Sequence, residues 1–111
     1  MTNKQRVCGL IGLATRAGKT TFGTEACMFG IEKKRTKLII VAEDSADRTK
    51  LNFEKACSSK QIEFRIYLNI EEISSSIGKQ NKAVVGINDI NYSNEILVCQ
   101  LLLQCGQFAV F

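Results

Sequence analysis

The run of five consecutive apolar residues LIIVA, at 38–42, restricts the fold more than any other stretch. A strand with no polar position has to be covered on both faces, which is typical of a central strand between two layers of helices. A glycine-bounded basic segment and a helical segment to about Lys34 precede it, and Glu43–Asp44 follows it. The sequence from Arg16 to Asp44 is therefore predicted to be a loop-helix-strand unit around which the rest of the chain is organised.

The spacing of apolar residues predicts the remaining elements. Apolar positions three and four residues apart predict helices, which cover about 4–15, 24–34, 47–59 and 70–77, with a last one from Ser93. Apolar or alternating runs predict further strands, at 64–68 and 83–87, with a brief edge strand at 20–22. This alternation predicts an α/β fold, a single-domain three-layer α-β-α sandwich with a central mixed sheet of about four strands.

A chain of 111 residues with 45% apolar content can bury a core of its own, and one domain over 1–111 is expected. Its tail, QCGQFAVF at 104–111, carries two phenylalanines and no charge. The sequence leaves three outcomes open for this tail, which are packing on the domain, pairing with the sheet edge of a partner, and disorder.

Short polar side chains at the expected helix starts are assigned as N-caps, because they accept hydrogen bonds from unpaired backbone N–H groups. Thr24 is expected to cap the second helix, either Ser45 or Asp47 the third, and Ser93 the last. The third helix is expected to turn four residues inward, namely Leu51, Phe53, Ala56 and Cys57.

The five cysteines, at 8, 27, 57, 99 and 105, include no C-x-x-C pair, and the sequence contains no histidine. This composition argues against a structural zinc site and against Ser-His-Asp or Cys-His catalysis. We therefore expect no metal, no cofactor and no enzymatic activity. The cysteines are interpreted as small buried residues in a reducing cytoplasm. No stretch reads as a signal peptide or a membrane span, so no membrane partner is expected.

The segment AGKT at 17–20 matches the end of a phosphate-binding P-loop, but the rest of that motif is missing. The motif requires a glycine where this chain has Leu13, and a buried strand where this chain has a predicted helix. A P-loop-like nucleotide binder therefore stays only a remote alternative.

Two charged clusters have a structural explanation beside a functional one. Glu43 and Asp44 follow a strand and are interpreted as a polar strand end that caps the next helix, rather than as metal ligands or acid-base carboxylates. The cations between Lys33 and Lys37 lie at a predicted helix C-terminus, where positive charge is favourable, and contact with phosphate is the alternative.

Two glycine-containing basic loops form the strongest candidate site. The helix after Gly23 begins with partial positive charge, and in a layered sandwich the loop from Gly78 to Ala83 can lie at the same end of the sheet. The cations of both loops, in a chain of net charge +4, predict a phosphate-binding edge. The candidate phosphate contacts are Arg16, Lys19, Lys79 and Lys82.

Several motifs occur together, namely GLATRAGK at 12–19, Gly23, KLIIVAED at 37–44 and IGKQNKAVVGI at 77–87. Over about 6–96 the chain resembles the bacterial YlxQ-like proteins, within the superfamily of archaeal-type ribosomal proteins that bind kink-turn RNA. The resemblance implies the same sandwich, association with the ribosome, and a structured RNA partner that is sharply bent and bulged, with tandem G·A pairs. It also implies RNA-contacting positions, which are Gly23, Thr24, Glu25 and Ala26 at the helix start and Gly78 to Ala83 in the later loop.

Three positions depart from the pattern of characterised kink-turn binders. Those proteins carry Asn-Glu at the positions of Glu25 and Ala26, and a lysine at the position of Phe29. The leading expectation is a non-enzymatic, cytoplasmic RNA-binding protein. The alternative is a protein-interaction or dimerisation module, a weak homodimer with a degenerate RNA site, which the three departures and the apolar run at 96–103 favour.

Overall fold

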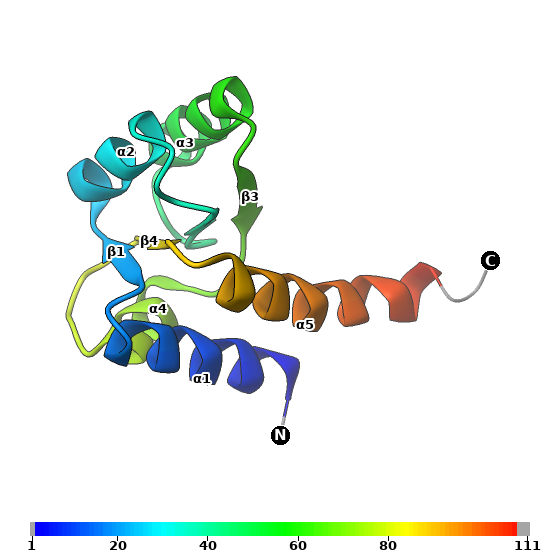
Figure 1. Cartoon of the computed structure of the whole chain (residues 1–111). Coiled ribbons are helices and arrows are strands. Elements are labelled where there is room, and N and C mark those ends of the chain that lie inside the picture. Colours follow the sequence, from blue (N-terminus) through cyan, green and yellow to red (C-terminus); the bar gives the residue numbers. More distant parts are fainter. Residues whose placement is uncertain (1, 109–111) are drawn as a thin grey trace.

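The computed structural model describes the backbone of residues 2–108 and the side chains of residues 2–99. Helices and strands alternate along the chain (Figure 1). The helices are α1 (Asn3–Arg16), α2 (Thr24–Glu32), α3 (Asp47–Lys60), α4 (Ile70–Ile77) and α5 (Ile90–Phe108). The strands are β1 (Thr20–Phe22), β2 (Leu38–Val41), β3 (Glu63–Ile66) and β4 (Val84–Ile87). Each predicted element is present, with bounds that differ from the prediction by a few residues at most.

The four strands form one mixed sheet in the order β1-β4-β2-β3. β1 and β2 both pair antiparallel with β4, whereas β2 and β3 pair in parallel. β2, the apolar run that begins at Leu38, is an inner strand and is buried at every position. The predicted mixed sheet of four strands is confirmed, and β1 is one of its edges as expected.

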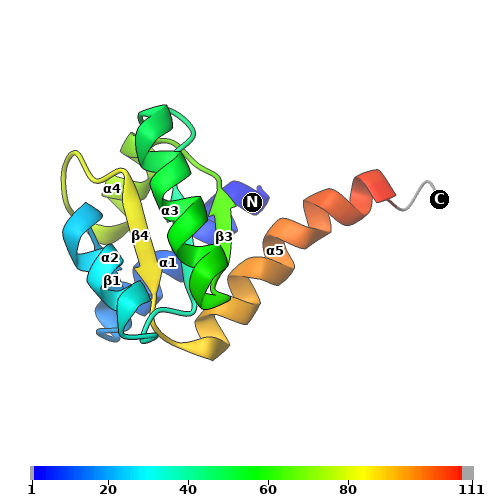
Figure 2. The ribbon, with the colours of Figure 1, turned by 90° about the horizontal axis from the view of Figure 1, so that it is seen from above.

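The residues of β2 divide between two apolar cores, one on each face of the sheet. Leu38 and Ile40 belong to the core with residues of α1, α4 and α5, while Ile39 and Val41 belong to the core with residues of α2 and α3. Figure 1 shows these two helical layers on opposite sides of the sheet, and Figure 2 shows α2 and α3 from their own side. The predicted α-β-α sandwich is confirmed.

The inward face of α3 is narrower than predicted. Phe53 and Cys57 are fully buried and Ala56 is half-buried, but Leu51 is 49% exposed. Leu51 stands two residues before Phe53, which places it about 200° around the helix from that residue, on the outer face. The assignment of Leu51 to the core is therefore wrong.

α2 lies close to the sheet because two glycines leave room for a buried threonine. A Cβ on Gly30 of α2 would overlap Oγ1 of Thr36. A Cβ on Gly86 of β4 would lie 3.0 Å from Cγ2 of the same threonine. Thr36 Oγ1 donates to Asn88 Oδ1 (3.0 Å), and Asn88 Nδ2 donates to Thr21 Oγ1 (2.8 Å). These hydrogen bonds join the segment between α2 and β2 to the end of β4 and to β1.

The predicted N-caps of α2 and α3 are wrong. The residues before these helices are Gly23 and Ala46, and neither has a side chain that accepts from the first turn. Thr24 and Asp47 are instead the first residues of their helices. The Ser45 hydroxyl donates to a backbone carbonyl three residues earlier, at 2.7 Å. Short polar side chains also stabilise turns in this way, so their position in the sequence does not decide which role they take.

α5 begins earlier than predicted, at Ile90. Asp89 accepts a hydrogen bond from the N–H of Tyr92 at 3.1 Å, so it serves the first turn of the helix. Ser93, the predicted cap, is buried inside the helix. The connection from β4 to α5 is therefore a short turn.

The last helix continues through Phe108 and projects beyond the body of the domain (Figures 1 and 2). The tail that the sequence left open over 104–111 is thus helical to 108, and 109–111 lie outside the described residues. In the described part of the chain, the structure contains no helix that is both long enough and apolar enough to span a membrane.

Two cysteine thiols are buried between the sheet and its α2–α3 layer. Burial raises the pKa of Cys27 from 9.0 to about 12 and the pKa of Cys57 from 9.0 to about 11. The unfolded chain therefore loses these thiol protons at a lower pH than the folded protein does. We expect the free energy of unfolding to fall as pH rises above about 9, whereas near neutral pH, where both thiols are protonated in both states, they give it no pH dependence. Denaturant titrations at neutral pH and at a pH of about 10 measure this fall. A Cys27→Ala/Cys57→Ala variant should show a smaller fall, and an equal one would assign it to other groups.

Candidate nucleic-acid interface

The chain enters α2 through a backbone conformation that favours glycine. Gly23 has φ 92° and ψ 155°. Its N–H donates to the carbonyl of Val84 and its carbonyl accepts from the N–H of Cys27, both at 3.1 Å. No side chain caps the helix, so the N–H groups of the first turn have no acceptor within it. The start of α2 therefore carries partial positive charge at the edge of the sheet.

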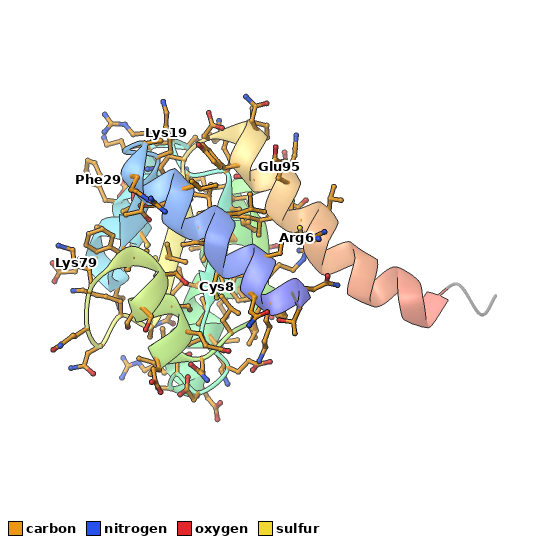
Figure 3. The ribbon with its side chains drawn as sticks, turned by 90° about the horizontal axis from the view of Figure 1, so that it is seen from below. Arg6, Cys8, Lys19, Phe29, Lys79 and Glu95 are labelled. Carbon is orange, nitrogen blue, oxygen red and sulfur yellow. The ribbon has the colours of Figure 1, made fainter. Side chains whose placement is uncertain are left out.

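Two lysines from the loop before β4 lie beside this helix start. Nζ of Lys82 is 4.0 Å from the position that a Cβ on Gly23 would take. Nζ of Lys79 is 5.4 Å from the centre of the Phe22 ring. Figure 3 shows Lys79 at the edge of the domain. The structure thus brings together the helix start at Gly23–Thr24 and the lysines of the later loop.

Ser74 of α4 holds the loop from Gly78 to Ala83 in shape. Its hydroxyl accepts from the N–H of Lys82 at 2.8 Å and donates to the carbonyl of Lys82 at 3.3 Å. Gly78 ends α4 in the left-handed region, with φ 70°. The sequence prediction did not include Ser74, although a hydroxyl on the buried face of an amphipathic helix needs a partner and signals one.

Arg16 and Lys19 lie at the other end of β1. Arg16 ends α1, and the carbonyl of Lys19 accepts from the N–H of Asn88, just after β4, at 2.8 Å. Because β1 and β4 are antiparallel, this is the opposite end of β4 from Lys82. Lys19 and Gly23 are separated along the strand by roughly 13 Å. The four predicted cations therefore form two clusters along one edge, and Figure 3 shows Lys19 and Lys79 apart on it.

The AGKT segment does not form a phosphate-binding loop. It follows helix α1 rather than a strand. The N–H of Gly18 donates to the carbonyl of Thr15 at 3.0 Å, and that of Lys19 donates to the carbonyl of Ala14 at 2.8 Å, closing the end of α1. Donors used in this way cannot surround a phosphate, which argues against a P-loop.

A hollow of about 550 Å³ lies beside α2 and the edge strand. The hydrogen bond between Asn88 and Thr21 joins two of its lining residues. The hollow is lined by Thr21, Glu25, Ala26, Phe29, Gly30, Arg35 and Asn88. The link formed by Thr36, Asn88 and Thr21 was not predicted, because it joins residues that are far apart in the sequence.

The acidic pair after β2 has a structural role through Asp44. Its Oδ1 accepts from the N–H of Ile70 at 2.8 Å, at the start of α4 rather than of the next helix, α3. The prediction that the pair caps the next helix is therefore wrong, since α3 has no side-chain cap and Asp44 serves the start of α4. Among residues whose side chains are described, no three potential metal ligands gather into one group.

The fold and its edge define a class of small α-β-α sandwich proteins, in which an uncapped helix start and a basic loop meet at the rim of a mixed sheet. A family model matches residues 5–97. The chain belongs to the family of that model, the ribosomal protein L7Ae/L30e/S12e/Gadd45 family.

Two curated relatives and one solved structure agree with this assignment. The RNA-binding protein YlxQ of Enterococcus faecium is 33% identical over 93 residues, covering 84% of this chain and 89% of the relative. The RNA-binding protein YlxQ of Bacillus subtilis (strain 168) is 27% identical over 88 residues, covering 79% and 88%. A protein of unknown function from Bacillus halodurans C is similar with a TM-score of 0.81 at 27% identity, covering 84% of this chain and 94% of that one. The resemblance to YlxQ-like proteins is confirmed.

Proposed function

We propose that this protein binds structured RNA of the kink-turn type, catalyses no reaction, and associates with the ribosome in the cytoplasm. The YlxQ relatives carry the description RNA-binding, and membership of the same family supports this function here. The geometry of the basic edge supports it independently.

The convergence of Lys79 and Lys82 on the uncapped start of α2 carries the proposal. Two ammonium groups beside unpaired N–H groups make a surface that binds phosphate whatever the base. Gly23 supplies the backbone conformation through which the chain enters α2, and this conformation sets the direction of the first-turn N–H groups. In this arrangement Thr24 and Glu25, in the first turn of α2, approach the bases.

The other predicted residues have supporting roles in this proposal. Gly78 and Ala83 shape the loop that carries the two lysines. Arg16 and Lys19, roughly 13 Å away along β1, bind a second phosphate of the same RNA.

Glu25 is assigned to the bases rather than to the RNA backbone. A carboxylate accepts hydrogen bonds from amino and imino groups but repels phosphate. Its position in the first turn of α2 also complements the helix dipole, so its charge is favourable to the free protein. Glu25 therefore selects base edges while the lysines bind phosphates.

A binding titration at two salt concentrations tests the proposal. The protein is titrated with a kink-turn RNA and with the same duplex in which Watson–Crick pairs replace the tandem G·A pairs. We expect tighter binding to the kink-turn RNA and a strong decrease in affinity with salt. Equal binding to both would contradict kink-turn recognition, and no binding to either would contradict RNA binding itself.

A groove between α1 and α5 supports a second candidate function, homodimerisation. The groove has a volume of about 320 Å³ and its lining includes Leu10 and the 54% exposed Val98. Arg6 and Glu95 also line it, and Figure 3 shows them near each other beside α5. A two-fold interface has to complement itself, and a groove with one cation and one anion meets this requirement when two copies face each other.

Val98→Glu is expected to convert such a dimer to a monomer in light scattering, because it places a charge in the apolar groove. Leu51→Glu on α3, at a site of similar exposure, is the control and should leave the dimer intact. If the unmodified chain is already a monomer, homodimerisation is rejected.

A further inference from the structure

Phe29 places an exposed aromatic ring among cations on α2. It is 52% exposed, in contrast to the buried Phe53. The Lys33 Nζ lies 5.6 Å from the centre of its ring, and the guanidinium carbon of Arg35 lies 5.9 Å from it. Figure 3 shows Phe29 on the same side of the molecule as Lys19 and Lys79.

The surroundings of Phe29 distinguish it from other exposed apolar residues. Single exposed apolar side chains are common and need no explanation. Phe29, however, lines the 550 Å³ hollow beside α2. Ala26 and Gly30 line the same hollow, and neither has a side chain that extends into it.

The two cations near the ring lie at the end of α2 and in the segment that follows it. Lys33 is the C-cap residue of α2, where positive charge complements the helix dipole. Arg35 follows in the turn before β2 and also lines the hollow. An exposed phenylalanine contributes little to folding, so the position of Phe29 beside the hollow is what points to a ligand.

The groups around the hollow match the parts of a nucleotide. An aromatic face stacks with any base, and nearby cations bind phosphate. Glu25 is four residues before Phe29, on the same face of the helix, and offers an acceptor to the N–H groups of a base. Arg35 offers donors to the phosphate group.

We infer that the hollow beside Phe29 is a stacking site for one unpaired nucleotide of a bound RNA. The base lies against the ring of Phe29 and donates to Glu25, and Arg35 binds the adjoining phosphate. The inference rests on the proposed RNA-binding function and adds a place on α2, at Phe29, for one nucleotide turned out of the RNA duplex. Bases inside a continuous duplex cannot reach the ring, because both their faces are stacked.

Two RNA hairpins that differ only in one unpaired nucleotide test this inference. In one hairpin the nucleotide is 2-aminopurine, whose fluorescence falls when it stacks, and in the other it is removed so that the stem is continuous. We expect the unmodified protein to bind the first hairpin about tenfold more tightly, in line with the contribution of one stacked base, and to quench the probe.

Variants at position 29 separate stacking from charge. Phe29→Ala is expected to remove the tenfold preference and the quenching, and Phe29→Tyr to retain both. Phe29→Lys adds a cation and is expected to tighten binding to both hairpins without restoring the preference. Leu51→Ala, at a site of similar exposure on α3, is the control and should change neither. Because both side chains are exposed, the melting temperatures of these variants should stay close to that of the parent.

Four outcomes would overturn the inference. Equal, salt-sensitive binding of both hairpins by the unmodified protein would leave general RNA binding intact but reject the stacking site. A preference that survives Phe29→Ala would place the unpaired nucleotide elsewhere. Tight binding of free 2-aminopurine ribonucleotide would indicate a small-molecule site instead. Absence of binding to any RNA would reject the proposed function together with the inference.

Discussion

Replacing Lys79 and Lys82 together by alanine is expected to lower the affinity for structured RNA by at least about tenfold at low salt. Both ammonium groups lie at the start of α2, one near the Phe22 ring and the other near Gly23. Each phosphate contact that is lost also removes a released counterion, so the slope of log affinity against log salt should become shallower by about two. Titrations over a series of salt concentrations measure both quantities.

The control for this prediction is a Lys55→Ala/Lys60→Ala variant. Both of these lysines lie on α3, away from the edge formed by β1. Each double variant removes two positive charges from a protein of net charge +4, so any effect of overall charge is the same in both. Similar losses of affinity in the two variants would mean that the protein attracts RNA through its net charge and has no phosphate site at α2.

The layers of the fold could be predicted because each one leaves a local pattern. The run from Leu38 has no polar residue, so it required cover on both faces, and the structure shows this cover. Helix starts were less predictable, because several short polar residues compete at each one. At α5 the residue that accepts from the first turn is Asp89, because its carboxylate accepts from the N–H of Tyr92. Ser93 lies inside the helix.

The arrangement of the candidate site could be predicted only in part. Its residue types are visible in the sequence, but their grouping depends on the direction in which β1 pairs. The antiparallel pairing of β1 with β4 places Gly23 beside Val84 and the preceding loop, and it places Lys19 beside Asn88. A three-residue strand contains no signal for this direction, so the separation of the cations into two clusters emerges only from the structure.

Gly23→Ala is expected to destabilise the protein by about 1–3 kcal/mol, because φ 92° with ψ 155° is a conformation that an L-residue other than glycine adopts only with strain. Space is not the limit here, since the nearest atom to an added Cβ would be Nζ of Lys82 at 4.0 Å. Gly9→Ala is the matched control. Gly9 lies inside α1 with no atom within 4 Å of an added Cβ, so this change should stabilise the protein by about 0.5–1 kcal/mol. Denaturant titrations of the two variants measure these opposite effects.

Gly23→Ala should also weaken RNA binding, since relief of the strain requires the peptide groups at the start of α2 to turn away from their present direction. A protein assembled with D-alanine at position 23 separates the two causes, because a D-residue favours positive φ while carrying the same methyl group. We expect D-alanine to restore most of the stability and the direction of the first-turn N–H groups, and therefore the RNA affinity. If the L- and D-alanine proteins lose affinity equally while only the D-form is stable, the methyl group itself blocks the RNA. The requirement for glycine would then be close approach of the ligand rather than backbone conformation.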